Sequence, residues 1–403
     1  MIAQRTVQRY YVYAFLNGLQ FTWTTWLAYV IARHGNPGWA EAAFHLAILF
    51  GEVPTGAIAD LFGRRTSMLV GLVLGAAASL SYLWVGGTLS AMVVLGVSGL
   101  AGTFLSGADT ALLYEAAEAA GGEDLARRAI SRAAALQWTA LAIGPAVAGA
   151  LYQWDSRAPF IGSAILRLVT VVVVLGLAEF RQERWSPAAR AARRGLLAQT
   201  RAAARVVLGN PTALTLVLFS WGYFTVGTLM SQYAQAYFPA AGLTMAATGL
   251  VFAAAHLFSV GGSTWTARLT EGGALRMLRF APLVLALSYL LMGVSGAWLG
   301  VGLFTLAAGL DGFLEPLSLH RLNTAIPSEQ RATILSLQSA GVSLLVSMAF
   351  PAASYLYPVA RIYLITGVVA TVLALAWVAR PWALRAQNAD ASLVAVGEAG
   401  TGG

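Results

Sequence analysis

The sequence contains no cysteine and no lysine, and only 10% of its residues are charged. Without cysteine, disulfides and thiolate metal sites are excluded, and the redox compartment stays open. Without lysine, the Gly-x-x-x-x-Gly-Lys-Ser/Thr loop that cradles nucleotide phosphates is excluded, so ATP is not expected to be the direct energy source. The four histidines show no catalytic or metal-binding spacing. We therefore expect neither an enzyme nor a cofactor or metal.

What the sequence has in excess is apolar surface. Hydrophobic residues make up 58% of the chain, and the mean hydropathy is +0.69, far from the values of a soluble domain. A bilayer core needs roughly 20 apolar residues per helix, so 403 residues accommodate about twelve spans. The apolar runs are continuous rather than alternating, which favours helices over a barrel. The first run lacks a cleavage site and is expected to be retained. The predicted fold class is an all-α membrane protein.

The apolar runs predict twelve transmembrane helices in two pseudo-symmetric six-helix bundles. The bundles would comprise residues 1–179 and 212–385. Between them, residues 180–211 are rich in alanine and arginine and predict a cytoplasmic linker with an amphipathic interfacial helix. Residues 386–403 show no apolar period and predict a disordered cytoplasmic tail. The predicted spans are 10–32, 38–60, 66–86, 89–117, 131–153, 158–179, 212–236, 245–267, 276–295, 297–319, 332–356 and 361–383.

Arginine supplies all 25 positive side chains and indicates the orientation. If both termini are cytoplasmic, 21 of these 25 arginines lie in inner segments. The exceptions are Arg33, Arg157 and Arg361 in outer loops and Arg167 inside a span. The positive-inside rule then predicts a multi-pass protein of the inner (plasma) membrane with cytoplasmic termini. The basic pI of about 10.0 reflects this topology and anionic lipid, so no nucleic-acid partner is expected.

Between the second and third spans, the segment GAIADLFGRR concentrates charge in an otherwise apolar region. Its glycines allow a tight helical hairpin, and its aspartate can accept hydrogen bonds from a neighbouring helix N-terminus. The pattern resembles the signature loop of the major facilitator superfamily, which implies a contact between this aspartate and helix 11, here beginning near Arg331. We expect the arginines to pair with Glu115 or Glu118; the alternative is a loop that only sets topology. The matching residues are Gly56, Asp60, Gly63, Arg64 and Arg65.

An internal repeat supports two equivalent halves. Gly107 and Asp109, with the segment through Glu115, align with Gly309 and Asp311, and the two aspartates lie 202 residues apart. This separation is half the chain, as expected for parallel repeats related by an axis along the membrane normal. The second copy of the signature loop is weak, because Arg268 stands where the acid is expected.

In the fifth span, the segment AIGPAVAGA is similar to the Gly-Pro-x-x-Gly-Gly segment of proton-driven drug exporters. Gly144, Pro145 and Gly149 match, while Ala148 replaces the first glycine of the pair. Small residues let helices approach closely, and proline adds a bend. The match favours export, although small residues also pack membrane helices without such a role.

Acids within spans are the candidates for proton coupling, because a charge at the bilayer centre costs about 2.5–3.5 kcal/mol on insertion scales. Two of them lie one helical turn apart in span 10, which disfavours simultaneous ionisation. The phrases GEVPTG, SGADTALLYE and RATILS resemble a bacterial branch of the superfamily containing many multidrug exporters. Alternatively, the acids are fixed partners of Arg167, His320 or Arg321. The candidates are Glu52, Asp109, Glu115, Asp311 and Glu315.

Aromatic residues crowd spans 1 and 7, which line the central cavity in the superfamily that the loop resembles. A wall of aromatics with Met230 suits bulky apolar or cationic molecules, although some aromatics would face lipid. Arg167 either binds an anionic substrate or neutralises Glu52 or Asp109, and His45 is a minor candidate for proton relay. The cavity candidates are Asn17, Gln20, Trp23, Gln137, Arg167, Trp221, Gln232 and His256.

Together these features predict a secondary active transporter that works by alternating access. We expect a proton-coupled exporter (antiporter) of amphipathic or cationic small molecules, acting as a monomer in the bilayer. An importer of a specific nutrient or metabolite on the same fold is the alternative, and it would have a more polar cavity. A membrane-embedded enzyme and a non-transporting sensor are further alternatives.

Overall fold

The computed structural model describes residues 2–180, 196–327 and 330–380, and these segments are helical with no strand. The first half contains seven α-helices and two short 3₁₀ helices, η1 (Thr22–Thr24) and η2 (Tyr82–Trp84). Its α-helices are α1 (Ile2–Gly18), α2 (Trp26–Ala32), α3 (Pro37–Phe62), α4 (Arg64–Ser81), α5 (Thr88–Leu105), α6 (Ala108–Trp154) and α7 (Ala158–Leu175). The second half contains α9 (Leu196–Gly209), α10 (Pro211–Ala240), α11 (Met245–Thr266), α12 (Glu271–Met292), α13 (Ala297–Ala325), α14 (Arg331–Ser354) and α15 (Val359–Val378).

The helices account for the twelve predicted spans. Ten segments of the described chain are long and apolar enough to cross a membrane. One of them, Thr88–Trp154, has 67 residues and would be about 100 Å long as a straight helix, far more than one bilayer crossing. It reverses at Gly121 and Gly122, where the backbone is non-helical and Gly122 has φ 78°, so it supplies two spans. The broken segment formed by α1, η1 and α2 supplies one more.

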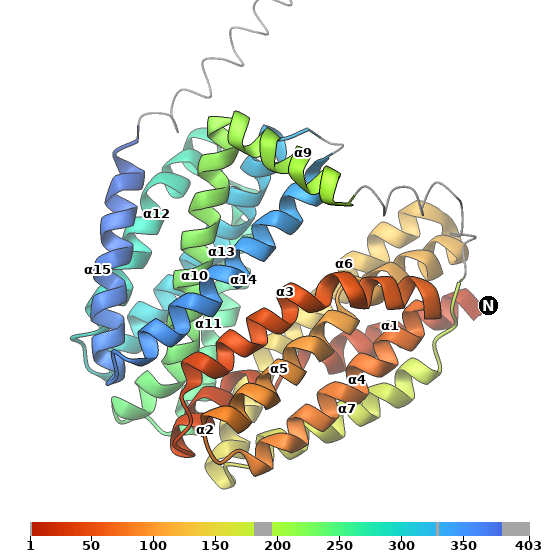
Figure 1. Ribbon diagram of the computed structural model, residues 1–403, viewed down its shortest axis with the longest axis horizontal. Helices are drawn as coiled ribbons and strands as arrows, with labels where there is room; N and C mark the ends of the chain where they lie inside the picture. The colour runs from red at the N-terminus through yellow and green to blue at the C-terminus, as the bar shows by residue number, and fades with distance from the viewer. Residues whose placement is uncertain (1, 181–195, 328–329, 381–403) are drawn as a thin grey trace, which may run out of the picture.

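The helices form two bundles with the same internal packing (Figure 1). In the first bundle α3 packs on α5, α4 on α7, and α1 on α6. In the second, the helices at equivalent positions repeat these contacts: α11 packs on α13, α12 on α15, and α10 on α14. The prediction of two pseudo-symmetric six-helix bundles is therefore confirmed.

Local sequence explains where several helices begin and end. Both α3 and α10 start with an Asn-Pro pair, in which the asparagine side chain caps the helix and proline occupies the first turn. The Oδ1 atom of Asn36 accepts from the amide of Gly38 at 2.8 Å, and Asn210 accepts from Thr212 at 3.0 Å. Helix α3 ends at Phe62, and α4 begins at Arg64. Gly63 between them has a φ of 101°, which glycine adopts at little cost.

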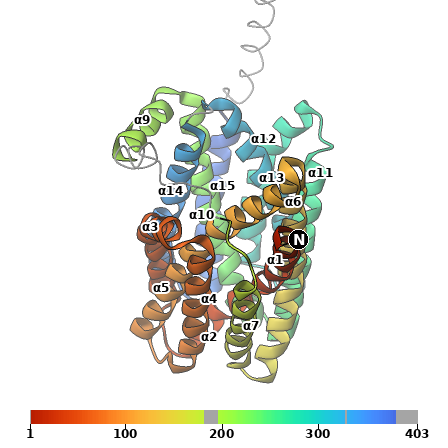
Figure 2. The same ribbon diagram turned by 90° about the vertical axis from the view of Figure 1, so that its right-hand side faces the viewer.

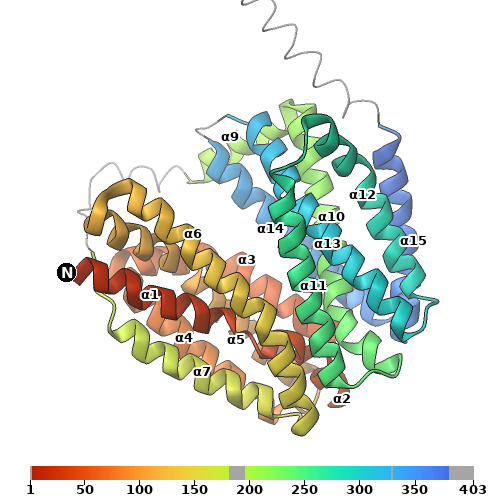
Figure 3. The same cartoon turned by 180° about the vertical axis from the view of Figure 1, so that it is seen from behind.

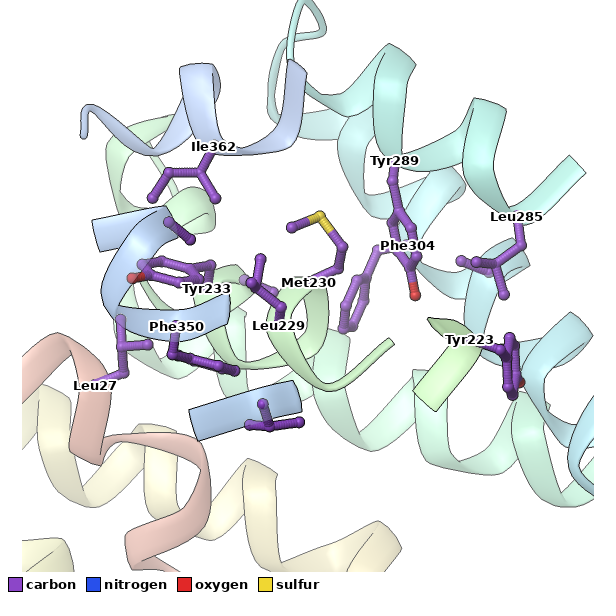
Figure 4. Close-up of a cluster of buried hydrophobic side chains, with 14 of the residues drawn as sticks. Leu27, Tyr223, Leu229, Met230, Tyr233, Leu285, Tyr289, Phe304, Phe350 and Ile362 are labelled. Carbon is purple, nitrogen blue, oxygen red and sulfur yellow. The ribbon is translucent and has the colours of Figure 1, made fainter. Parts of the chain in front are cut away.

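The two bundles meet at one end of the molecule, which we call the Gly38 end because α3 begins there. At this end α3 contacts α14, α6 contacts α11, and α2 contacts α10. A buried apolar cluster crosses the boundary, with Leu27 beside Tyr233 and Phe350 (Figure 4). Toward the opposite end, called the Asp60 end, the two bundles diverge (Figures 1 and 3).

Helix α9 lies within the segment predicted as an amphipathic linker. It packs against α10 and α14 at the margin of the second bundle, and its residues Ala203 and Val207 are buried (Figure 2). The part of the linker at 181–195 and the predicted tail at 386–403 lie outside the described residues.

Candidate transport cavity and gates

Close helix packing seals the Gly38 end between α6 and α11. A Cβ added to Gly249 of α11 would lie 3.0 Å from the Cα of Gly149 and even closer to the carbonyl oxygen of Pro145. Only glycine allows this approach, so the predicted Gly-Pro-x-x-Gly-Gly segment places Pro145 and Gly149 at the boundary between bundles. Gly144 instead faces α1 of its own bundle, where an added Cβ would lie 3.3 Å from the Gln20 nitrogen.

Two glutamines of α10 add a polar layer to the same seal. Gln232 accepts a hydrogen bond from Trp26 Nε1 at 3.3 Å, and Gln235 accepts from the Leu27 amide at 3.0 Å. Gln235 also donates to the Trp23 carbonyl at 3.0 Å. The two bonds of Gln235 pair backbone groups at the break between η1 and α2. Gln232, predicted to contact substrate, is only 1% exposed and belongs to this seal; Gln235 was not predicted at all.

At the Asp60 end, the signature loop is tied to its own bundle. Arg64 Nη2 lies 3.1 Å from Glu115 Oε1, with both side chains largely buried, which confirms the predicted pairing with Glu115. Arg65 instead donates to the Leu177 carbonyl at 3.1 Å. The carboxylate of Glu179, a residue missed in the sequence, lies directly over Gly63, where a Cβ would collide with it.

The first residues of the loop are more open. Asp60 and Gly56 are exposed, and a Cβ added to Gly56 would have no atom within 4 Å outside its own helical turn. Helix α14 begins at Arg331 as expected, and the Arg331 side chain donates to the Asn323 carbonyl. A contact between Asp60 and the first turn of α14 stays a prediction. Between described residues, the hydrogen bonds that join the bundles all lie at the Gly38 end.

One aspartate in each bundle is held by a tyrosine of an equivalent helix. Tyr13 of α1 donates to Asp109 Oδ2 of α6 at 3.1 Å, and the Thr110 amide donates to Asp109 Oδ1 at 2.6 Å. In the second bundle, Tyr223 of α10 donates to the Asp311 carboxylate of α13. The aspartates were predicted as repeat mates, whereas the tyrosines were seen only as cavity aromatics.

The other acids differ from this pair. Glu115 is engaged by Arg64, while Glu52 and Glu315 are exposed on their helices. Arg321 pairs with Glu271 at 3.4 Å rather than with a membrane-embedded acid. Within the described part of the chain, no cation lies within 4.0 Å of Asp109, Asp311 or Glu315, so a fixed ion-pair role for them is not supported.

A cavity of about 320 Å³ lies inside the first bundle, enclosed by α1 and by α3 to α7. Four of the predicted cavity residues line it together with Asp109. Serines, Glu41 and Tyr82 add further polar groups to its wall. Gln137 lies instead in a smaller adjoining cavity of about 90 Å³, which it shares with Tyr13 and Asp109. The predicted residues of the larger cavity are Asn17, Gln20, Trp23 and Arg167.

Arg167 reaches from α7 into this cavity. Its guanidinium lies against Gly75 of α4, where an added Cβ would collide with it. Its electrostatic neighbours are the hydroxyls of Tyr13 and Tyr82. Among the described residues, no carboxylate lies within 4.0 Å of Arg167, so the hypothesis that it pairs with Glu52 or Asp109 is not supported.

Glu41 is an ionisable cavity residue that the sequence reasoning missed. It lies on α3, is 1% exposed, and its Oε1 has no hydrogen-bond partner among the described residues. His45 Nε2, one turn further along, lies 3.5 Å from this oxygen. The acid and histidine four residues apart within a predicted span were the available signal.

Three predicted cavity residues lie elsewhere. Met230 is fully buried within the second bundle, so the prediction that it walls the cavity was wrong (Figure 4). Trp221 packs against α14 at Gly341, and His256 is partly buried on α11. Met230 and Gln232 lie two residues apart on α10, so their side chains point to different faces of the helix. One face contributes to the seal between the bundles and the other to the core of the second bundle.

Two repeated helical bundles that meet at one end, with acids in equivalent helices, define the fold of an alternating-access membrane transporter. Residues 11–351 match the family model described as Major Facilitator Superfamily. The match spans most of the chain, and the protein belongs to this superfamily. No curated protein sequence matches it significantly.

Solved structures of transporters show the same fold at low sequence identity. The nucleoside transporter NupG has 14% identity and a TM-score of 0.71, with 93% of this chain and 98% of that chain covered. The inward-open xylose transporter XylE from E. coli has 15% identity and a TM-score of 0.67, with 92% and 95% covered. A POT family transporter in complex with a thioalcohol-conjugated peptide has 12% identity and a TM-score of 0.66, with 92% and 95% covered.

Proposed function

We propose that this protein is a proton-coupled secondary transporter that exports amphipathic small molecules by alternating access. The repeated tyrosine–aspartate pair is the observation that carries the proposal. A carboxylate within the membrane is costly unless it has a partner or a proton, and neither Asp109 nor Asp311 has a cation within 4.0 Å among the described residues. A tyrosine hydroxyl stabilises the ionised form by donating, and it can accept from the protonated form, so it supports both states.

The arginine distribution supports a cytoplasmic location for the Asp60 end and both termini, and with this orientation the structure corresponds to an inward-facing state. In the outward-facing state the Gly38 end opens, and Asp60 closes against the first turn of α14. Asp109 and Asp311 bind protons when the Gly38 end is open and release them toward the cytoplasm. Proton entry thereby drives substrate exit.

Export is supported by the glycine contact between α6 and α11. Gly149 and Gly249 let two helices of opposite bundles touch at backbone distance, and such a contact can close and open as a unit. The resemblance of this segment to proton-driven exporters points the same way. Trp23, Trp26 and Phe44 line the cavity and suit an amphipathic substrate with an aromatic body.

Import of a specific polar solute is the second candidate function, and one observation favours it. The cavity carries Asn17, Gln20, Ser98 and Ser163 besides its charged residues, which is more polar than a multidrug site requires. The similar nucleoside and xylose transporters carry polar solutes of that kind.

Transport by purified protein in proteoliposomes tests the proposal. With an imposed proton gradient, ethidium, 4-(aminomethyl)benzoate, xylose and a dipeptide are compared as substrates, with and without a protonophore. We expect flux of an amphipathic compound in the direction opposite to the protons, lost on adding the protonophore. Flux of a single polar solute in the same direction as protons would instead support import. Fluxes that are unchanged by the protonophore would contradict proton coupling.

A further inference from the structure

The cavity of the first bundle holds charges of both signs that do not neutralise one another. Arg167, Glu41 and Asp109 all line it, and no ion pair within 4.0 Å joins Arg167 to either acid. Charged groups within a membrane bundle normally pair with one another, because an unpaired charge is costly there. Opposite charges held apart in one cavity therefore leave room for a ligand that satisfies both.

Both charges lie near one buried tyrosine. Tyr82 is 2% exposed and interacts electrostatically with both Glu41 and Arg167. The Arg167 guanidinium packs against Gly75 of α4, and Glu41 lies on α3 near the seal between the bundles. Arg167 and Glu41 are thus both close enough to influence the Tyr82 hydroxyl, yet no ion pair within 4.0 Å joins them.

The roles of the two acids differ. Asp109 accepts from Tyr13 and Thr110, so its oxygens are already engaged. Glu41 is more deeply buried, at 1% exposure, and its Oε1 lacks a hydrogen bond within the described chain. His45 Nε2 lies 3.5 Å away and leaves that oxygen without a formed hydrogen bond. Glu41 is thus the acid available to an ammonium group, while Asp109 remains available to the proton.

We propose that this cavity binds a zwitterionic substrate, with its anionic group at Arg167, its ammonium group at Glu41 and an aromatic body against Trp23, Trp26 and Phe44. The inference rests on the proposed transport function and names its substrate class. It narrows the expectation of amphipathic or cationic substrates to molecules that carry both charges. The volume of about 320 Å³ accommodates a small aromatic amino acid or an amine-bearing carboxylate.

Binding to the purified full-length protein tests this assignment without any gradient. Isothermal titration calorimetry compares 4-(aminomethyl)benzoate with benzylamine and benzoate, which keep the ring and one charge each. A hydrogen bond to a charged group contributes about 1.5–3 kcal/mol, so the zwitterion is expected to bind about tenfold tighter than either single-charge probe, or more. Equal or weaker binding of the zwitterion overturns the proposal.

Variants then assign each charge to its residue. Arg167→Gln should reduce zwitterion affinity about tenfold and leave benzylamine binding unchanged, whereas Glu41→Gln should leave benzoate binding unchanged. Arg167→Lys should restore part of the affinity, and Arg157→Gln, on an exposed arginine at the start of the same helix, should match the wild type. Equal losses for all three probes in Arg167→Gln contradict the assignment. If that variant does not fold, the wild-type comparison and Arg167→Lys still decide.

The two proposals fail in different ways. A zwitterion preference without protonophore-sensitive flux in proteoliposomes contradicts proton-coupled transport and leaves the binding site intact. Proton-driven flux without a zwitterion preference in calorimetry contradicts the binding site and leaves the transport function intact.

Discussion

The two bundles share a partly buried acid but differ in what surrounds it. In each, a tyrosine of the first helix donates to an aspartate of the fourth span: Tyr13 to Asp109 and Tyr223 to Asp311. Only the first bundle adds Arg167 and Glu41 around an internal cavity. In the second, α15 carries no charge beyond Arg361 in its first turn.

The cavity of the second bundle is correspondingly different. It has a volume of about 250 Å³, lies between α10, α12 and α15, and is lined mainly by apolar side chains such as Phe219, Leu285 and Trp377. Under the proposed function, the repeated tyrosine–aspartate pair is the proton site, whereas the charges proposed to recognise substrate belong to the first bundle alone. A rocking transporter needs both bundles to move but only one to hold the specific charges.

The largest expected effect concerns the shared acids. Asp109→Asn and Asp311→Asn should each abolish gradient-driven transport in proteoliposomes, because an amide cannot carry the proton. Exchange of substrate at equal concentrations should survive, since it needs no net proton movement. Thermal stability in detergent serves as the folding control. If Asp311→Asn transports normally while Asp109→Asn does not, the bundles are not equivalent and proton coupling belongs to the first alone.

A second large effect is expected at the seal between bundles. Gly249→Leu introduces a side chain where α6 and α11 touch, and such overpacking costs about 1–3 kcal/mol. The closed Gly38 end should become about five- to hundredfold less populated, and transport should fall with it. Gly261→Leu on the same helix is the control, because nothing lies within 4 Å of its added Cβ. Equal transport by the two variants would falsify the role of this contact.

The ion pairs of the two bundles are expected to contribute differently to the stability of the protein. Arg64 and Glu115 are 12% and 7% exposed, whereas Glu271, the partner of Arg321, is 66% exposed. Arg64→Gln should destabilise the protein by about 3 kcal/mol, and Arg321→Gln by less than about 1 kcal/mol. Unfolding in mixed micelles with increasing denaturing detergent measures both. Similar losses would show that burial does not distinguish the two pairs.

The smallest effect concerns the tyrosines. Tyr13→Phe and Tyr223→Phe each remove one hydrogen bond, worth about 1 kcal/mol, and should slow gradient-driven transport about fivefold. The two variants should behave alike, with Tyr11→Phe on the same helix as a control. A large effect for one tyrosine and none for the other would show that the two tyrosine–aspartate pairs have different roles in transport.

Apolar run length and residue spacing predicted most of the fold. The twelve spans, the two bundles and the Arg64–Glu115 pairing follow from signals that are local in sequence or repeated within it. The repeat also identified Asp109 and Asp311 as mates. The spans and the repeat are properties of one helix or of two equivalent helices, which is why a single sequence contained them, whereas the Arg64–Glu115 pairing followed from the positions of charged residues next to predicted spans.

The residues that line the cavity were harder to predict from the sequence. Whether a side chain of α10 faces substrate, seal or core depends on helix rotation, so Gln232 was assigned to the cavity and Gln235 was overlooked. Glu41 was missed because it lies near the start of a span, where an acid is unremarkable without knowledge of its neighbours. The surroundings of Arg167 include Gly75 and Tyr82, which are distant from it in sequence.

In the proposed mechanism, protonation of the paired aspartates shifts the bundles between two states that open at opposite ends. Because the chain has no cysteine, spin labels can be placed cleanly at Phe62 and Trp265 for the Asp60 end and at Trp154 and Tyr355 for the Gly38 end. Each of these side chains is more than half exposed, and each pair spans the two bundles.

Pulsed electron–electron resonance then measures both distances in mildly acidic and mildly alkaline buffer. We expect reciprocal changes, with the distance in one pair shortening as the other lengthens, and loss of this response in the double variant Asp109→Asn, Asp311→Asn. Distances that do not respond to pH, or a reciprocal response that persists in the double variant, would contradict the proposed mechanism.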